Sequence, residues 1–211
     1  MLYIFDWDGT IIDSTAKIVR CMQGAIALNG LEYREPIAVQ QIIGLGLPEA
    51  IRVLYPSIEA EALDGLRQSY SEIFIEEDRT PCSFYPGVRS TLDYLRDEGH
   101  QLAVATGKSR RGLSRVLNNL DMGGFFHSTR CADETSSKPD PLMLFEILDE
   151  LSVPLEQAVM IGDTAFDLQM ANAAGIPAIA VSYGAHSVER LSACKPVMTI
   201  DHFDQLLAWR C

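Results

Sequence analysis

From about residue 85 onward, short apolar segments alternate with amphipathic ones, and the first such apolar segment stands at the start of the chain. The runs that are short and rich in β-formers predict buried strands, and the runs with apolar residues at helical spacing predict helices. The expected strands cover residues 2–5, 102–105, 158–161, 177–181 and 197–200, with a short one beginning at Phe125-Phe126. The expected helices cover residues 88–98, 109–120, 141–151, 165–174 and 203–209. Strands that alternate with helices predict an α/β fold with a parallel, doubly wound sheet.

Residues from about 14 to 84 follow a different pattern, in which apolar residues recur at helical spacing and no strand is evident. Ser14 is a candidate N-cap for a helix that Asn29-Gly30 would end. Pro48 can begin a second helix, and an apolar stripe between residues 58 and 76 predicts a third. We therefore expect a Rossmann-like core domain interrupted by an all-helical domain. The expected core covers residues 1–14 and 85–211, and the expected insert covers residues 15–84.

The composition excludes several classes of protein. Hydrophobic residues make up 47% of the 211 positions, which is enough for a sizeable core. A net charge of −12 repels nucleic acid and anionic lipid, so neither is an expected partner. No apolar run approaches the roughly 18 residues that span a bilayer, and the first residues lack the basic region of a signal peptide. Reduced thiols in a cytoplasmic protein are expected of the scattered cysteines, which are Cys21, Cys82, Cys131, Cys194 and Cys211.

Polar clusters follow three of the predicted strands directly. The carboxylates among them are Asp6, Asp8, Asp163 and Asp167. Because the ends of parallel strands meet at one edge of the sheet, these four side chains should converge. Carboxylates held together repel one another unless a cation lies among them, and oxygen ligands with open positions suit Mg²⁺. The sequence therefore predicts a magnesium site, although Mn²⁺ or Co²⁺ could replace Mg²⁺ with such ligands.

The spacing of these polar residues also indicates chemistry. Asp6 and Asp8 are two residues apart, so in an extended segment both could reach one substrate, one to attack it and the other to exchange protons. The simpler alternative is that Asp8 belongs to a turn and Asp6 to a cap. The hydroxyl of Thr106 and the backbone of Gly107 could bind an anion where a helix begins, or Thr106 could only cap that helix. Lys138 could supply a fixed cation or be a solvated side chain.

Taken in order, these motifs resemble the haloacid dehalogenase-like hydrolases, in the branch with a helical cap. The resemblance covers nearly the whole chain and includes Tyr85-Pro-Gly-Val88 as the return from cap to core. Within the family, the phosphoglycolate phosphatase-like members look most similar, and the loop Gly44-Leu-Gly-Leu-Pro-Glu49 fits them. The matching motifs are Phe5-Asp6-Trp-Asp8-Gly-Thr-Ile-Ile-Asp-Ser14, Thr106, Lys138-Pro139 and Gly162-Asp163-Thr-Ala-Phe-Asp167.

The resemblance implies an Mg²⁺-dependent phosphatase that hydrolyses a small phosphorylated metabolite through an aspartyl-phosphate. Asp6 would attack phosphorus, and Asp8 would protonate the leaving alcohol and then activate water. Thr106 and Lys138 would bind the phosphoryl oxygens. The metal would be held by the carboxylate of Asp6, the backbone carbonyl of Asp8 and Asp163, with Asp167 supporting either the metal or Lys138.

The sequence offers several candidate residues for binding the rest of the substrate. Arg20 and Arg52 are candidates in the cap for binding a doubly anionic substrate, and Arg110, Arg111 and Arg115 either form a solvated helix face or offset the negative field locally. Asp8 favours phosphate esters over carbon–halogen bonds within the family. Trp7, between the two aspartates, is expected to pack in the core. The partner is a small molecule, and we expect a monomer or weak dimer.

Two other functions are compatible with the same sequence motifs. A β-phosphoglucomutase-type phosphoryl transferase would use the same intermediate but would need to protect it from water, and a bisphosphate activator would reveal it. A binding protein that keeps only the fold is expected to lose Asp6 or Lys138, and the chain has both.

Overall fold

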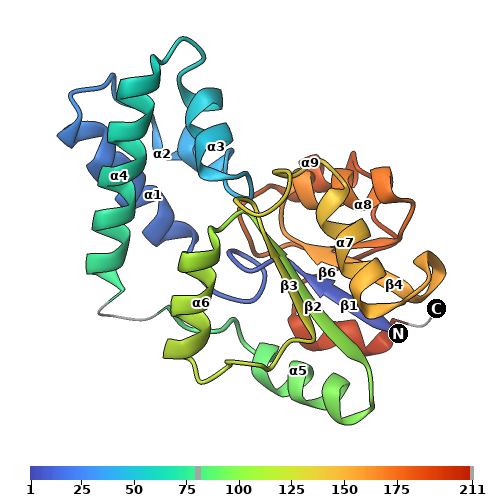
Figure 1. The fold of residues 1–211 in the computed structure, drawn as a ribbon. Helices are drawn as coiled ribbons and strands as arrows, with labels where there is room; N and C mark the ends of the chain where they lie inside the picture. Colours follow the sequence, from blue (N-terminus) through green and yellow to red (C-terminus); the bar gives the residue numbers. More distant parts are fainter. Residues whose placement is uncertain (79–81, 210–211) are drawn as a thin grey trace.

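A parallel sheet of six strands organises the computed structural model, which describes residues 1–78 and 82–209 (Figure 1). The strand order is β3-β2-β1-β4-β5-β6, so β1 lies near the middle with β2 and β4 on either side. The strands are β1 (Leu2–Phe5), β2 (Gln101–Thr106), β3 (Ser128–Cys131), β4 (Ala158–Gly162), β5 (Ala178–Val181) and β6 (Met198–Ile200). The expected α/β fold with a parallel, doubly wound sheet is confirmed.

Helices cover both faces of the sheet because alternate residues of each strand are apolar on both sides. Phe5 packs on the face that α5, α6 and η2 cover, and Ile4 packs on the face that α7, α8 and α9 cover. These helices are α5 (Val88–Asp97), α6 (Arg110–Asn119), α7 (Leu142–Leu151), α8 (Ala165–Ala174), α9 (Val188–Ser192) and the 3₁₀ helix η2 (Phe203–Ala208); a second 3₁₀ helix, η1 (Leu155–Gln157), precedes β4.

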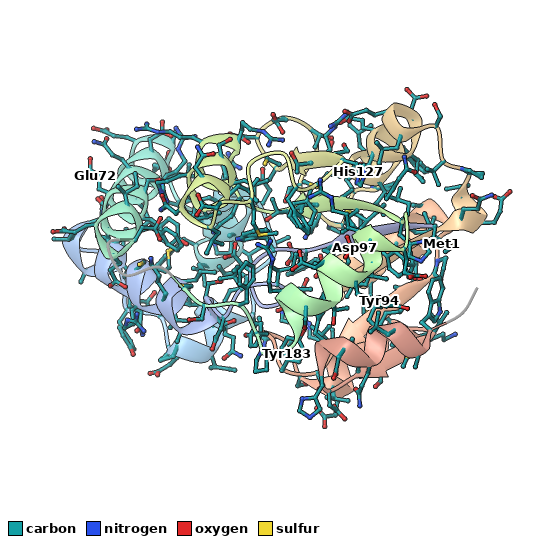
Figure 2. The ribbon with its side chains drawn as sticks, turned by 90° about the horizontal axis from the view of Figure 1, so that it is seen from below. Met1, Glu72, Tyr94, Asp97, His127 and Tyr183 are labelled. Carbon is teal, nitrogen blue, oxygen red and sulfur yellow. The ribbon has the colours of Figure 1, made fainter. Side chains whose placement is uncertain are left out.

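Four helices between β1 and α5 form a separate group beside one edge of the sheet (Figure 1). They share an apolar cluster that includes Met22, Ile51 and Leu66. Glu72 in this group and Met1 of the sheet lie at opposite ends of the molecule (Figure 2). This separate core supports the proposed division into a core of residues 1–14 and 85–211 and a cap of residues 15–84. The helices are α1 (Thr15–Leu28), α2 (Pro36–Gln40), α3 (Leu47–Leu54) and α4 (Ala60–Glu77).

The two chain segments that join the helical group to the sheet pair with each other. Ile12 and Phe84 form an isolated antiparallel bridge. The N–H of Asp13 donates to the carbonyl of Ser83 at 3.0 Å, and the N–H of Tyr85 donates to that of Ile11 at 3.1 Å. The described parts of the two connections are therefore held together next to Asp8.

Several details differ from the sequence-based expectation. Phe125 and Phe126 do not begin a strand, since β3 begins at Ser128; their rings pack edge to face in the core with centroids 5.2 Å apart. The last helix is 3₁₀ rather than α. Helices α2 and α9 were not expected, because five residues are too few to show helical spacing. Ser14 occupies the expected N-cap position, but its side chain makes no capping hydrogen bond.

Other expectations hold in the described part of the chain. Trp7 is 1% exposed and packs against Phe126, as expected for a core residue. The cysteines other than Cys211, which lies outside the described residues, are free thiols. Of the helices described, none combines the length and apolar character that a membrane span requires.

Candidate active site

The polar clusters of the sequence meet at one edge of the sheet because the three central strands end together. Phe5, the last residue of β1, pairs with Val104 of β2 and Ile161 of β4. The residues that follow these three positions therefore emerge side by side, as the parallel arrangement requires. Asp6 follows β1 directly, and Thr106 ends β2. Both line the same cavity. Of the four carboxylates expected to converge, Asp6, Asp163 and Asp167 lie together, and Asp8 lies outside that group.

A buried ammonium group joins two of the four carboxylates. Nζ of Lys138 lies 2.7 Å from Oδ1 of Asp6 and 2.6 Å from Oδ1 of Asp167, and all three side chains are at most 1% exposed. Burial raises the pKa of Asp6 well above its usual value, although the nearby Lys138 charge acts to lower it. Burial also lowers the pKa of Lys138, but the two carboxylates raise it by more. Lys138 is therefore a protonated, fixed cation beside Asp6.

Asp167 is held in place by the start of its own helix. Its second oxygen, Oδ2, accepts hydrogen bonds from the backbone N–H of Thr164 at 3.0 Å and from the Thr164 hydroxyl at 2.7 Å. These contacts form a capping box at the N-terminus of α8. Both oxygens of Asp167 are thus engaged, one by the helix cap and one by Lys138. Of the two roles expected for Asp167, these contacts favour support of Lys138.

Asp163 is fixed by two neighbouring loops. Its Oδ1 accepts from the Thr10 hydroxyl at 2.9 Å, and its Oδ2 accepts from the backbone N–H of Ala185 at 2.7 Å. Burial, followed by the charge of Asp167, raises the pKa of Asp163 to about 7. Gly9 packs so closely against this carboxylate that a Cβ would overlap it, and Gly9 has a φ of +85°. Glycine is therefore required at this position for two independent reasons.

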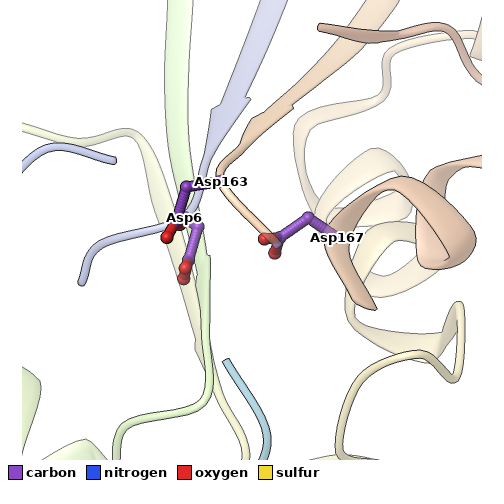
Figure 3. A group of neighbouring side chains, drawn as sticks. All are labelled: Asp6, Asp163 and Asp167. Carbon is purple, nitrogen blue, oxygen red and sulfur yellow. The ribbon is translucent and has the colours of Figure 1, made fainter. Parts of the chain in front are cut away.

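Three of the carboxylates are placed to hold a cation. Oxygen atoms of Asp6, Asp163 and Asp167 all lie within 4.8 Å of one another, and Figure 3 shows Asp167 reaching from α8 toward the other two. Oδ2 of Asp6 is buried and has no hydrogen-bond partner among the described residues. Three buried carboxylates beside one ammonium leave excess negative charge, and hard oxygen donors suit Mg²⁺. The residues present therefore fit a hard divalent cation.

Asp8 faces a different partner from the other carboxylates. Its Oδ1 accepts from the hydroxyl of Ser14 at 2.6 Å, and Nζ of Lys108 lies 2.9 Å from its Oδ2. The carboxylate of Asp8 lies outside the group of three around Lys138. The expectation that the metal is bound by the backbone carbonyl of Asp8 stays a prediction.

Lys108 is a site residue that sequence reasoning missed. It stands directly after Thr106 and Gly107, the residues expected to bind an anion. Its ammonium pairs with Asp8 and lies 4.7 Å from the centroid of the Phe74 ring. A lysine two residues beyond the end of a central strand was the available signal. Its partner could not be named without the fold.

A cavity of about 850 Å³ opens above these residues, between the helical group and the edge of the sheet. Asp6, Asp8 and Thr106 form its polar floor. Helix α4, helix α6 and the loop of residues 42–49 provide its walls. Lys138, Asp163 and Asp167 are not among the lining residues, so they act from behind the floor. The expectation that Lys138 binds phosphoryl oxygens itself stays a prediction.

The loop of residues 42–49 covers Gly107, the residue expected to bind phosphate through its backbone. A Cβ on Gly107 would lie 2.5 Å from the carbonyl oxygen of Leu45 and 2.6 Å from that of Gly44. The N–H of Gly46 donates to the hydroxyl of Ser137 at 2.8 Å. The helical group is therefore docked on the sheet, with its loop directly over the predicted phosphate site.

The arginines of the helical group expected to bind substrate are not among the described residues that line the cavity. Arg52 is exposed, does not line the cavity, and lies 3.8 Å from Glu49 on its own helix. The physical reason is that α3 turns its apolar face, not this residue, toward the rest of the protein. Arg20 is also exposed and pairs with Glu77. The arginines that do line the cavity are Arg67, Arg111 and Arg115.

Comparisons with known proteins identify the family and relatives of the chain. The family model for haloacid dehalogenase-like hydrolases matches residues 3–181. The phosphoglycolate phosphatase of Pseudomonas fluorescens Pf-5 is 31% identical over 212 residues, which cover 98% of this chain and 78% of that protein. "Probable phosphatase IndB" of Dickeya dadantii is 31% identical over 210 residues, covering 98% and 91%. A solved hydrolase from Pseudomonas syringae shares the fold, with a TM-score of 0.90 and 20% identity over 99% of this chain and 97% of that one.

Proposed function

The chain belongs to the haloacid dehalogenase-like hydrolases, and we propose that it is a phosphatase for small phosphate monoesters that works through an aspartyl-phosphate. The observation that carries this proposal is the state of Asp6. This carboxylate lines the cavity, one of its oxygens is held by Lys138, and the other has no hydrogen-bond partner among the described residues. A carboxylate that lines a cavity beside a fixed cation is placed to act as a nucleophile.

The proposed reaction has two steps that share one set of residues. In the first, a carboxylate oxygen of Asp6 forms a bond to phosphorus while the bond to the leaving oxygen breaks, and Asp8 gives that oxygen a proton. In the second, water attacks phosphorus, Asp8 takes a proton from the water, and the bond to Asp6 breaks. This sequence returns Asp6 as a carboxylate and Asp8 as a protonated acid.

Positioning and charge are the main contributions of the protein to such a reaction. Lys138 offsets the charge of Asp6 from behind the floor, and Asp167 keeps Lys138 there. Lys108 and Ser14 hold the side chain of Asp8 at the floor. We propose that the hydroxyl of Thr106 and the backbone of Gly107 bind the phosphoryl oxygens.

A divalent cation is part of this proposal. Asp6 and Asp163 would hold Mg²⁺ through their carboxylates, Asp8 would hold it through its backbone carbonyl, and Asp167 would support the site. When bound, Mg²⁺ would offset the negative charge of the transferred phosphoryl group. The unpaired oxygen of Asp6 and the excess of carboxylates over cations support this assignment.

The test is phosphate release from a panel of small esters, including 2-phosphoglycolate, with Mg²⁺ and with EDTA. The proposal predicts turnover that requires the metal and that disappears in Asp6→Asn. Asp149→Asn is the matched control, because Asp149 is exposed on α7 and far from the cavity. A folded wild-type protein that releases phosphate from none of the esters would overturn the proposal. Turnover that requires an added sugar bisphosphate would instead favour a mutase.

A further inference from the structure

Three arginines follow the strand that carries Thr106, and the structure gives each a different environment. Arg110 pairs with Glu134 at 2.6 Å and also donates to Thr129, so it fastens α6 to β3. Arg115 pairs with Asp78 at 2.6 Å. Arg111 lines the cavity, is exposed, and makes no ion pair with any described residue. Of these three arginines, Arg111 is therefore the one whose charge is not paired with a carboxylate of the described residues.

Arg111 is also distinct from the other cations of the cavity. Lys108 is paired with Asp8, and Arg67 lies 3.4 Å from Asp64 on its own helix. With Arg115 held by Asp78, Arg111 is the cation without a carboxylate partner in the described cavity lining. Because the helical repeat places residues four apart on one face, Arg111 sits one turn from Arg115 on the side of α6 that faces the cavity.

Arg111 lies in a cavity whose lining carries several acidic side chains. The protein carries a net charge of −12, and the cavity lining includes Glu49, Asp64 and Asp133 in addition to the floor. Of these, Asp133 accepts a hydrogen bond from the backbone N–H of Arg110 at 2.8 Å. An anionic leaving group would be repelled from such a cavity unless a local cation received it. Arg111 can present a planar guanidinium to a carboxylate or a phosphate.

The size of the cavity leaves room for a leaving group that reaches beyond the floor. Ligand pockets of about 300–1,000 Å³ accommodate molecules of drug size, and this cavity of about 850 Å³ lies in that range. Apolar side chains such as Ile18, Met22 and Phe74 also line the cavity. A substrate could therefore place its phosphate at the floor and a second anionic group at Arg111.

We propose that Arg111 is a specificity residue that binds a second anionic group on the substrate, so that the preferred esters carry a carboxylate or second phosphate on the leaving group. This inference rests on the proposed phosphatase function and adds the substrate class to it. It assigns no role to Arg111 in the chemical steps. Its effect should therefore appear as a preference between substrates and leave the reaction of an ester with an uncharged leaving group unchanged.

The test uses esters that differ only in the far group. The two-carbon pair is 2-phosphoglycolate and ethyl phosphate. The six-carbon set is 6-phosphooxyhexanoate, 1,6-hexanediol bisphosphate and n-hexyl phosphate. The first carries a carboxylate at its far end, the second carries a phosphate there, and the third has no charged group there, so the set shows which anion is preferred. The measured quantity is the ratio of kcat/KM for the anionic ester to that for its neutral-ended partner, in wild type and in Arg111→Gln. A charge-assisted contact at an exposed site predicts a loss of about tenfold in this ratio.

Two further variants separate specificity from stability. Arg111→Lys keeps the charge and should restore part of the preference. Arg89→Gln removes an exposed arginine on α5 that pairs with Asp93, lies over the Phe125 ring and is not among the residues lining the cavity, so it should leave the ratio unchanged. The kcat for ethyl and hexyl phosphate should stay within about twofold of wild type in Arg111→Gln. A ratio unchanged by Arg111→Gln at both chain lengths, in an enzyme that turns the esters over, would overturn this inference alone. Absence of turnover with every ester would instead count against the proposed function.

Discussion

The ammonium of Lys138 lies 2.6 Å from Oδ1 of Asp167, and that contact ties the floor of the cavity to the first turn of α8. The other oxygen of Asp167 completes the capping box with Thr164, so one carboxylate both begins a helix and holds a buried cation. The same ammonium lies 2.7 Å from Asp6. The position of the proposed nucleophile is therefore linked, through two ion pairs, to the start of a helix that covers the sheet.

Asp167→Asn should lower kcat more than it changes KM. The amide keeps the shape but removes one of the two charges that hold Lys138, so Lys138 would no longer be fixed against Asp6. Loss of a partner from a buried ion pair costs about 3–5 kcal/mol, and the remaining pair with Asp6 places the expected loss toward the lower end. Urea unfolding and steady-state kinetics measure the two effects. The exposed variant Asp149→Asn should show neither, and an Asp167→Asn enzyme with wild-type kcat would contradict the positioning role.

Gly107→Ala should reduce activity without unfolding the core. Its new Cβ would lie 2.5 Å from the carbonyl oxygen of Leu45, so the loop of residues 42–49 would have to move away from the predicted phosphate site. We expect a rise in KM of at least about tenfold with an almost unchanged melting temperature. Gly123→Ala is the matched control, because its Cβ would meet only Asn118 at an ordinary distance of 3.6 Å. Equal kinetics in the two variants would show that the docked loop is not needed for catalysis.

Asp78→Asn should loosen the helical group from α6. Asp78 follows α4 and pairs with both Lys17 of α1 and Arg115 of α6, so it is a contact between the helical group and the core. Its removal leaves two largely buried cations without their carboxylate, which favours separation of α4 from α6. Amide hydrogen exchange in α4 should become faster, whereas exchange in β1 should not change. Glu76→Gln changes an exposed neighbour and serves as the control; exchange in α4 that is the same in both variants would argue against this contact.

The thiols of Cys21 and Cys131 should resist alkylation in the folded protein. Burial raises the pKa of each to about 12, and both side chains are fully buried. A raised pKa keeps the thiol neutral at pH 8, so very little of the reactive thiolate is present there. Iodoacetamide labelling at pH 8, followed by mass spectrometry, should modify these two positions only after urea is added. Rapid labelling of either one without urea would contradict the buried placement.

Much of the site followed from local features of the chain. Asp6 follows strand 2–5, and Asp163 comes shortly after strand 158–161. In a parallel sheet the ends of both strands lie at the same edge. Trp7 was placed in the core for an equally local reason, since neighbouring residues of an extended segment face opposite sides. These outcomes depend only on strand periodicity and on the direction in which strands run.

Other features depended on contacts between residues far apart in the sequence. Lys108 and Asp8 are 100 positions apart, and nothing in either segment names the other as its partner. Phe125 and Phe126 have the composition of a strand, but ring packing in the core took precedence over β-propensity. Arg52 and Arg111 are both arginines on amphipathic helices, and only the docking of those helices shows which of them reaches the cavity.

The sequence by itself determined the type of fold and the identity of the residues at the sheet edge, because hydrophobic periodicity and strand polarity act over short stretches of chain. Only the tertiary structure decided which cation each carboxylate meets and which arginine of the described cavity lining has no carboxylate partner. Those outcomes depend on how the helical group docks on the sheet, and that docking is set by many long-range contacts at once, such as Gly46 with Ser137 and Asp78 with Arg115.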